Sequence, residues 1–131
     1  MKFYKKASVV AAIVAAVSFG VVFVQTASAA TTTVAVGSGG NHFVPASVTI
    51  SPNDSVVWTW STGFHSSTSG TNGVHGDDNG VPSGSWDSGV IQTLPFSYTN
   101  TFTSAGAFKY YCTVHFSVGM TGQVLVAAAS L

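Results

Sequence analysis

The stretch Cys112-Thr113-Val114-His115-Phe116-Ser117-Val118-Gly119-Met120 lies between two segments that have the composition of β-strands. The segment before it, Ala107–Cys112, reads AFKYYC, and the segment after it, Gly122–Ala127, reads GQVLVA. Aromatic and β-branched residues of this kind are typical of strands that contribute to a core. The stretch is therefore predicted to be a short loop that joins two strands, with Cys112 at the end of the first.

Further short segments of strand character precede this loop, and none of the chain after residue 30 shows sustained helical periodicity. In Phe96–Phe102, aromatic residues and Asn alternate with Ser and Thr, so that one face can be buried. Turn-forming residues separate the other predicted strands, which are Thr32–Val36, Ser47–Ser51 and Ser55–Trp60. About seven or eight short strands without a helix predict an all-β fold, a Greek-key β-sandwich or barrel.

The region Ser61–Gly89 differs from the rest because Gly, Ser, Thr, Asn and Asp dominate it. We interpret it as a long irregular connection, with short strands around Phe64–Ser69 and Trp86–Val90. The tryptophans Trp58, Trp60 and Trp86 are expected to pack in the core or under loops.

The loop carries three side chains that bind soft metal ions. Cys112 offers a thiolate, His115 an imidazole and Met120 a thioether. A blue-copper site combines two histidines and a cysteine in a near-trigonal plane with methionine as a weak axial ligand. His65, which follows the Ser55–Trp60 strand, is the candidate for the second imidazole. These four residues predict one mononuclear copper ion, and a site of this kind carries electrons.

The alternative for Cys112 is an inert buried thiol. Cys112 is the only cysteine. The amino-terminal residues described below predict export, and an unpaired thiol in an exported protein is expected to serve chemistry or to pair with another chain. An inert thiol also leaves the positions of His115 and Met120 unexplained.

The pattern C-x2-H-x4-M followed by Thr121-Gly122-Gln123-Val124 resembles the ligand loop of plastocyanin-like cupredoxins, the type 1 blue copper proteins. Further similar stretches are Phe43-x-Pro45, Asp54–Trp58, Trp86–Gly89 and Tyr110-Tyr111 before the cysteine. The resemblance covers nearly all of the chain after residue 30. It implies a cupredoxin-like fold and the copper ligands His65, Cys112, His115 and Met120.

Three positions depart from the family pattern. Members often have proline before the first histidine and asparagine after it, where this chain has Phe64 and Ser66. The asparagine helps to tie the two ligand regions together, so Ser66 must replace it or the tie is looser. Val114 stands where proline commonly lies between the cysteine and the loop histidine.

The amino-terminal region resembles a signal peptide. Three lysines precede the apolar run Ser8–Val24, and Ala27-Ser28-Ala29 supplies the small residues of a cleavage site. We expect residues 1–29 to be removed and residues 30–131 to form one domain that is periplasmic, at the cell surface or extracellular. The alternative is an uncleaved anchor, although the run is slightly short for a membrane span.

Charge excludes some partners. Residues 30–131 contain one lysine, Lys109, against four aspartates, a formal charge of −3. Nucleic-acid binding depends on clustered Lys and Arg, so no nucleic acid is expected. We expect a monomer that meets redox protein partners near His115, within an apolar collar of Val114, Phe116 and Val118. Tyr111 is either a second exit for the electron or a packed aromatic.

The other histidines have simpler explanations. His42 is expected at the surface. His75 lies near Asp77 and Asp78, a cluster that could form a loose secondary metal site but is more simply solvated. No nucleophile–base pattern such as G-x-S-x-G is present, so we expect no enzyme.

Two other functions fit the sequence in part. One is an exported protein of the same fold that carries or buffers copper without a redox partner. The other is a metal-free β-sandwich module for adhesion or carbohydrate binding, which the Ser- and Thr-rich composition favours.

Overall fold

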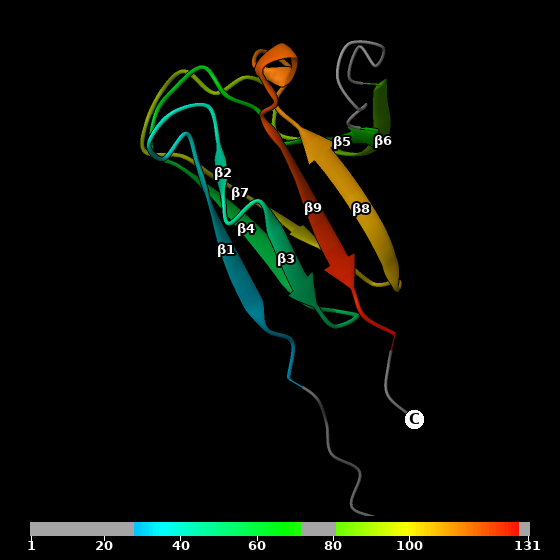
Figure 1. Cartoon of the computed structure of the whole chain (residues 1–131). Helices are drawn as coiled ribbons and strands as arrows, with labels where there is room; N and C mark the ends of the chain where they lie inside the picture. The colour runs from blue at the N-terminus through cyan, green and yellow to red at the C-terminus, as the bar shows by residue number, and fades with distance from the viewer. Residues whose placement is uncertain (1–27, 72–80, 129–131) are drawn as a thin grey trace, which may run out of the picture.

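The computed structural model describes residues 28–71 and 81–128, and nine β-strands form two sheets within these residues. The first sheet has the order β2-β1-β4-β7 and the second the order β3-β9-β8-β5-β6. Figure 1 shows the two sheets packed face to face. The all-β sandwich predicted from the sequence is confirmed, with nine strands in the described residues rather than seven or eight.

The strands of the first sheet are β1 (Thr31–Val36), β2 (Phe43–Val44), β4 (Ser55–Trp60) and β7 (Ser97–Thr101). The strands of the second are β3 (Ser47–Ile50), β5 (Thr68–Thr71), β6 (Val81–Asp87), β8 (Gly106–Tyr111) and β9 (Thr121–Val126). Strands β1 and β4 pair in parallel, as do β3 and β9, and every other pairing is antiparallel.

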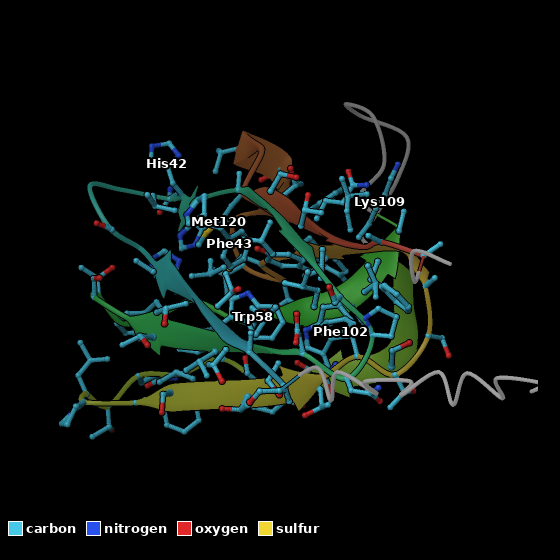
Figure 2. All side chains as sticks on the ribbon, turned by 90° about the horizontal axis from the view of Figure 1, so that it is seen from below. His42, Phe43, Trp58, Phe102, Lys109 and Met120 are labelled. Carbon is cyan, nitrogen blue, oxygen red and sulfur yellow. The ribbon has the colours of Figure 1, made fainter. Side chains whose placement is uncertain are left out.

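Alternation along the strands builds the core. On β4, Val56, Trp58 and Trp60 are buried while Thr59 is exposed, as expected for a strand with one face on the core. Trp58 from the first sheet packs against two rings of the second, with ring centroids 5.4 Å from Trp86 and 5.3 Å from Tyr110. The prediction that the tryptophans are packed is confirmed, and Figure 2 shows Trp58 inside the sandwich.

The region Ser61–Gly89 is more regular than its composition indicates. It contains β5 and β6, which pair with each other, and β5 also pairs with β8. Ser69 pairs with Tyr110 of β8 and Gly70 with Pro82 of β6. Pairing with these strands, rather than local preference for a strand, determines their conformation.

The loop Cys112–Met120 lies between β8 and β9, as predicted, and it contains one turn of 3₁₀-helix, η1 (Phe116–Val118). Figure 1 shows η1 at the upper end of the sandwich, while β1 begins at the lower end. No helix among the described residues has the length and hydropathy needed to cross a membrane.

Candidate metal site

The Cys112–Met120 loop is closed by its own backbone. The Cys112 N–H donates to the Met120 carbonyl at 3.0 Å, and the Met120 N–H donates to the His115 carbonyl at 3.2 Å. Gly119 adopts a left-handed conformation (φ 84°) and its N–H donates to the Phe116 carbonyl, which ends η1 at a position that glycine occupies without strain. These bonds hold Cys112, His115 and Met120 at fixed positions relative to one another.

His65 reaches the same end of the sandwich from the first sheet. It follows β4 after a short turn, and its carbonyl accepts bonds from the Trp60 indole N–H and the Ile91 N–H, both at 2.9 Å. The Phe64 N–H in turn donates to the Ile91 carbonyl at 2.7 Å. The segment carrying His65 is therefore held by an isolated bridge to a second loop, and the side chain is only 3% exposed.

The structure brings three of the four predicted ligands together. Cys112 Sγ lies 3.9 Å from His65 Nδ1 and 3.7 Å from His115 Nδ1, and the two Nδ1 atoms are 3.1 Å apart. All three donor atoms lie within 4.8 Å of one another, so one ion can contact all of them. Met120 is 1% exposed and bonded through its backbone to Cys112 and His115; Figure 2 shows its side chain inside the sandwich.

The donor set fits copper. One thiolate and two imidazoles meet, with His65 and Cys112 buried and His115 partly exposed, and a thioether is available on the same loop as the thiolate. This is the ligand chemistry of a mononuclear electron-transfer copper site. Burial, and then the proximity of His115, lower the pKa of His65. The neutral imidazole that a metal requires is thus favoured.

The comparisons with known proteins agree with this geometry. The family model described as "Copper binding proteins, plastocyanin/azurin family" matches residues 30–127. The chain belongs to the plastocyanin/azurin family. Plastocyanin-like members of the family are single-electron carriers that bind copper.

Individual relatives support the assignment to the plastocyanin/azurin family. A chloroplastic plastocyanin of Tetradesmus obliquus is 36% identical over 106 residues, covering 76% of this chain and 68% of that protein. The plastocyanin of Scenedesmus fuscus is 31% identical, covering 68% and 90%. Among solved structures, oxidised plastocyanin from Dryopteris crassirhizoma superposes with a TM-score of 0.55 at 25% identity, over 73% of this chain and all of that one.

Ser66 stands at a position where plastocyanin-like proteins often have asparagine, and it links the two ligand segments. Its Oγ accepts a bond from the Thr113 N–H at 2.9 Å, and its own N–H donates to Cys112 Sγ at 3.4 Å. Its hydroxyl also pairs with those of Thr68 and Thr113. Ser66 is fully buried. Ser66 therefore replaces the asparagine of the family pattern in linking the segment of His65 to the loop of Cys112.

Thr62 and Gly37 are site residues that sequence reasoning missed. Thr62 Oγ1 donates to the Gly37 carbonyl and lies 3.1 Å from His65 Nε2. A hydroxyl whose proton is given to Gly37 must accept from the Nε2–H, which leaves Nδ1 unprotonated on the side of Cys112. Gly37 has φ 75°, and a Cβ there would meet Thr62 Oγ1 and, at 2.7 Å, the ring of His65. Only glycine fits this close approach.

Large apolar side chains are exposed around the site. His115 is partly exposed, and Val118 (65% exposed), Phe64 (60%) and Val114 (48%) are its most exposed large neighbours on the ligand segments. The segments 61–66, 88–95 and 112–120 contain no Asp, Glu, Lys or Arg. These three segments therefore contribute no acidic or basic side chain to the surface around His115.

The remaining predicted residues lie elsewhere. His42 is exposed and does not join the cluster. Tyr111 is 2% exposed and packs edge-on against Phe116 with centroids 5.6 Å apart, which favours the packed aromatic over an exit route. His75, with Asp77 and Asp78, lies outside the described residues, so the secondary metal site stays a prediction.

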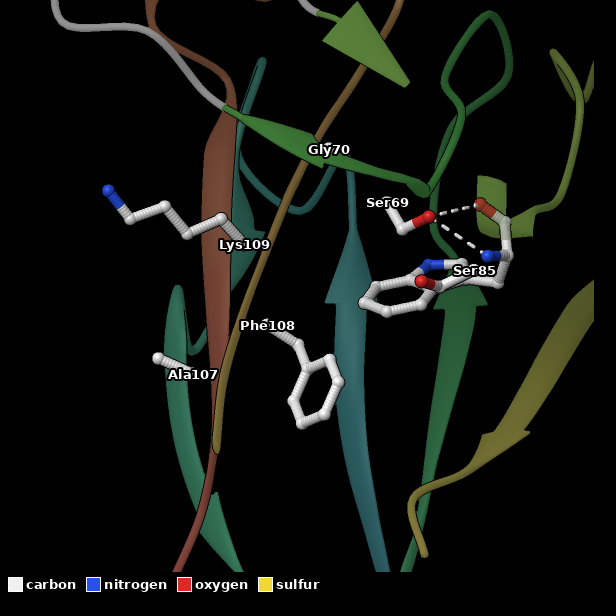
Figure 3. A pocket seen from close by; sticks show the side chains of 7 residues that line it. Ser69, Gly70, Ser85, Ala107, Phe108 and Lys109 are labelled. Atoms are coloured by element: carbon white, nitrogen blue, oxygen red, sulfur yellow. Dashed lines mark hydrogen bonds between the residues drawn. The ribbon is translucent and has the colours of Figure 1, made fainter. Parts of the chain in front are cut away.

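A hollow of about 300 Å³ lies away from the three donor atoms, between β5, β6 and β8 (Figure 3). The Phe108 ring and Trp86 form its apolar wall, and the Ser69 hydroxyl on its rim is bonded to the Trp86 backbone. Lys109 extends to the opposite side from Phe108. The hollow includes none of the predicted copper ligands.

Proposed function

We propose that this chain is an exported type 1 copper protein that carries single electrons, with one copper ion held by His65, Cys112, His115 and Met120. The observation that carries the proposal is the meeting of His65 Nδ1, Cys112 Sγ and His115 Nδ1 within 4.8 Å. Membership of the plastocyanin/azurin family supports copper as the ion. A metal-free adhesion module accounts for neither observation.

Copper, when bound, supplies a one-electron couple; the chain supplies a site that need not rearrange. The Cys112 thiolate and the Met120 thioether are soft donors that suit Cu(I), and imidazoles suit both oxidation states. Backbone bonds within the loop and the Ser66 tie hold the donors in place. A preorganised donor set limits the reorganisation that electron transfer requires.

We place the exit for the electron at His115. Its imidazole is the partly exposed ligand, whereas His65, Cys112 and Met120 are each at most 3% exposed. The apolar residues around it, Phe64, Val114 and Val118, form a surface on which a redox protein partner can dock. Transient redox encounters between proteins bury little surface, so a small face of this kind is sufficient.

Export completes the proposal. We propose that residues 1–29 direct the chain across a membrane and are cleaved, and that residues 30–131 act in the periplasm, at the cell surface or outside the cell. The three lysines, the apolar run and the small residues before Ala30 support this. The match of the family model begins at residue 30, where the mature domain is proposed to begin.

The test is to express residues 30–131, add Cu(II), and record visible absorption and EPR spectra. We expect an intense blue or green colour from thiolate-to-Cu(II) charge transfer and a narrow hyperfine splitting. Cys112→Ser removes the charge-transfer donor and should abolish the colour. A colourless wild-type product with ordinary Cu(II) splitting would contradict the proposal.

Voltammetry separates the electron carrier from a copper buffer. A fast and reversible one-electron couple is expected of a carrier. A site that loses copper on reduction would favour buffering.

A further inference from the structure

The carboxylate of Asp54 lies at the end of the sandwich opposite to the metal site, in the turn between β3 and β4. Its Oδ1 accepts a bond from the Ala30 backbone N–H at 2.7 Å, and its Oδ2 accepts one from the Ser51 N–H at 2.8 Å. The Ala30 carbonyl also accepts from the Ser55 N–H at 2.9 Å. Asp54 is 9% exposed. Ala30 is thus held from both sides just before β1 begins.

Asp54 has no basic partner among the side chains that the structure describes. The described lysine, Lys109, belongs to β8 in the other sheet, and His42, His65 and His115 belong to loops at the metal end. Asp87, the other described acidic residue, is at the end of β6. Burying most of a carboxylate without a counter-charge costs folding free energy. A positive charge on the group that faces Asp54 would therefore stabilise the fold.

We propose that removal of residues 1–29 places a positive charge on Asp54. Hydrolysis of the Ala29–Ala30 peptide bond consumes one water, leaves a carboxylate on Ala29, and converts the Ala30 amide nitrogen, already 2.7 Å from Oδ1, into an α-ammonium group. The hydrogen bond becomes an ion pair that fastens the start of β1 to the β3–β4 turn. The inference rests on the proposed cleavage site and not on the metal.

The surroundings of Ala30 accommodate the new group. Ser28, Ala29 and Ala30 are exposed, so their peptide bonds do not contribute to the core. A hollow of about 260 Å³ lies beside Ala30 and Asp54 and is lined on the other side by Ser51, Pro52 and Asn53. Ser28 and Ala29 complete its lining, so their removal opens it to water. An ammonium group has three donors; one can bond to Asp54 while the others face this hollow and water.

The pairing has a defined dependence on pH. The Ala30 and Ser51 amides hold the pKa of Asp54 below its usual value, so Asp54 is charged at neutral pH. An α-amino group ordinarily titrates near pH 7.7–8.0, and a neighbouring carboxylate raises its pKa. The stability that the ion pair adds is fully present below the ordinary pKa of the α-amino group. It is lost as pH rises through the raised pKa of that group in the folded protein. On the acid side it is lost as pH falls through the lowered pKa of Asp54.

The experiment compares residues 30–131 with a control chain of residues 29–131. Every described strand and the whole described core lie after Ala30, so both chains contain the complete fold. In the control, residue 30 again has an amide nitrogen and the ammonium is moved one residue away. Each chain is also made with Asp54→Asn.

We expect NMR titration to give a raised α-amino pKa in the 30–131 chain, and Asp54→Asn to return it to the ordinary range. The folding constant of the 30–131 chain, from urea unfolding, should fall roughly three- to tenfold relative to the control between about pH 7 and pH 10. An ordinary α-amino pKa that Asp54→Asn leaves unchanged would overturn the proposal, as would identical pH profiles for the two chains.

Mass spectrometry of the exported protein provides the remaining check. An amino terminus at Ala30 supports the proposal, and any other terminus overturns it for the natural protein. The copper spectra are a separate result, because Asp54 lies at the far end of the sandwich. A blue protein with an ordinary α-amino group would contradict only this inference, and a colourless one only the proposed function.

Discussion

The two segments that carry the proposed ligands are held in different ways. The loop Cys112–Met120 is closed by bonds within itself, between Cys112, His115 and Met120. The segment Thr62–Ser66 has little internal support, and its contacts are with Gly37, Ile91 and Thr113. The loop is a local structure that sequence spacing can specify. The other segment is positioned by residues from three other parts of the chain.

This difference predicts unequal outcomes when each histidine is removed. His65→Gly and His115→Gly should both lose nearly all of the charge-transfer absorption, because each removes an imidazole from the trigonal plane. Added free imidazole should restore the colour of His115→Gly, since His115 is partly exposed. It should not restore His65→Gly, whose side chain is 3% exposed.

Visible absorption during imidazole titration measures both variants. Equal recovery of colour in the two variants would show that imidazole reaches both positions equally well. That result would contradict the predicted difference between the buried His65 and the partly exposed His115.

Thr62→Val tests whether a contact outside the loop orients the buried ligand. Valine keeps the shape but cannot accept the His65 Nε2–H, so the imidazole loses the partner that fixes its tautomer. We expect copper affinity to fall by about 10- to 100-fold. Thr62→Ser keeps a hydroxyl and should retain most of the affinity.

Competition titration measures that affinity, and ¹⁵N NMR of the metal-free protein reports the His65 tautomer. Thr62 is exposed, so stability should change by no more than about 0.5 kcal/mol. An unchanged affinity and tautomer in Thr62→Val would show that the hydroxyl has no positioning role.

Ser66 and Ser67 form a matched pair at the junction of the two segments. Both are fully buried, and the hydroxyl of each accepts a hydrogen bond from an N–H group. Ser66 Oγ accepts from the Thr113 N–H, whereas Ser67 Oγ accepts from the Trp86 indole. Ser67→Ala leaves the buried Trp86 indole N–H without its partner and should cost about 1–3 kcal/mol of unfolding free energy. Ser66→Ala removes the acceptor of the partly buried Thr113 N–H and should cost about 1 kcal/mol.

Only Ser66→Ala should also alter the copper spectra and the reduction potential, because only Ser66 joins the segment of His65 to that of Cys112. Urea unfolding, EPR and voltammetry on both variants distinguish the two roles. Equal spectral shifts in Ser66→Ala and Ser67→Ala would mean that general loosening, rather than the tie, affects the site.

The same contrast explains how much the sequence could predict. Cys112, His115 and Met120 lie within nine consecutive residues between two clear strands, so their meeting needed only a strand–loop–strand pattern. His65 came from the ligand count and the family resemblance. The role of Ser66 could be asked as a question but not answered, because the answer depends on a bond to a residue 47 positions away.

Other features carried no usable signal. Thr62 is one of many polar loop residues, and its contact with Gly37 spans 25 positions. Asp54 enters the sequence analysis only as the first residue of the Asp54–Trp58 stretch, because nothing local indicates that Ala30, 24 positions earlier, lies against it. The short strand predicted around Phe64–Ser69 only overlaps β5 (Thr68–Thr71), because the conformation of these small polar residues depends on pairing with neighbouring strands.

The smallest expected effect concerns the surface that the two segments share. Val118 belongs to the loop and Phe64 to the other segment, and both are at least 60% exposed. If the electron leaves through His115 at an apolar contact, Val118→Asp and Phe64→Asp should each slow electron self-exchange between oxidised and reduced copies about tenfold. When two copies of a variant meet through this face, the new aspartates of both copies lie in the contact. They lose water and repel each other, which slows the encounter.

Leu125→Asp is the matched control for this surface. Leu125 is 37% exposed on β9, toward the end of the strand remote from Met120. The same charge placed there should leave the self-exchange rate nearly unchanged, and none of the three variants should bleach the copper. NMR line broadening in mixtures of the two oxidation states gives the rates. Slowing by Val118→Asp alone would restrict the docking surface to the loop, whereas equal slowing by Leu125→Asp would show that net charge, and not this face, controls the exchange.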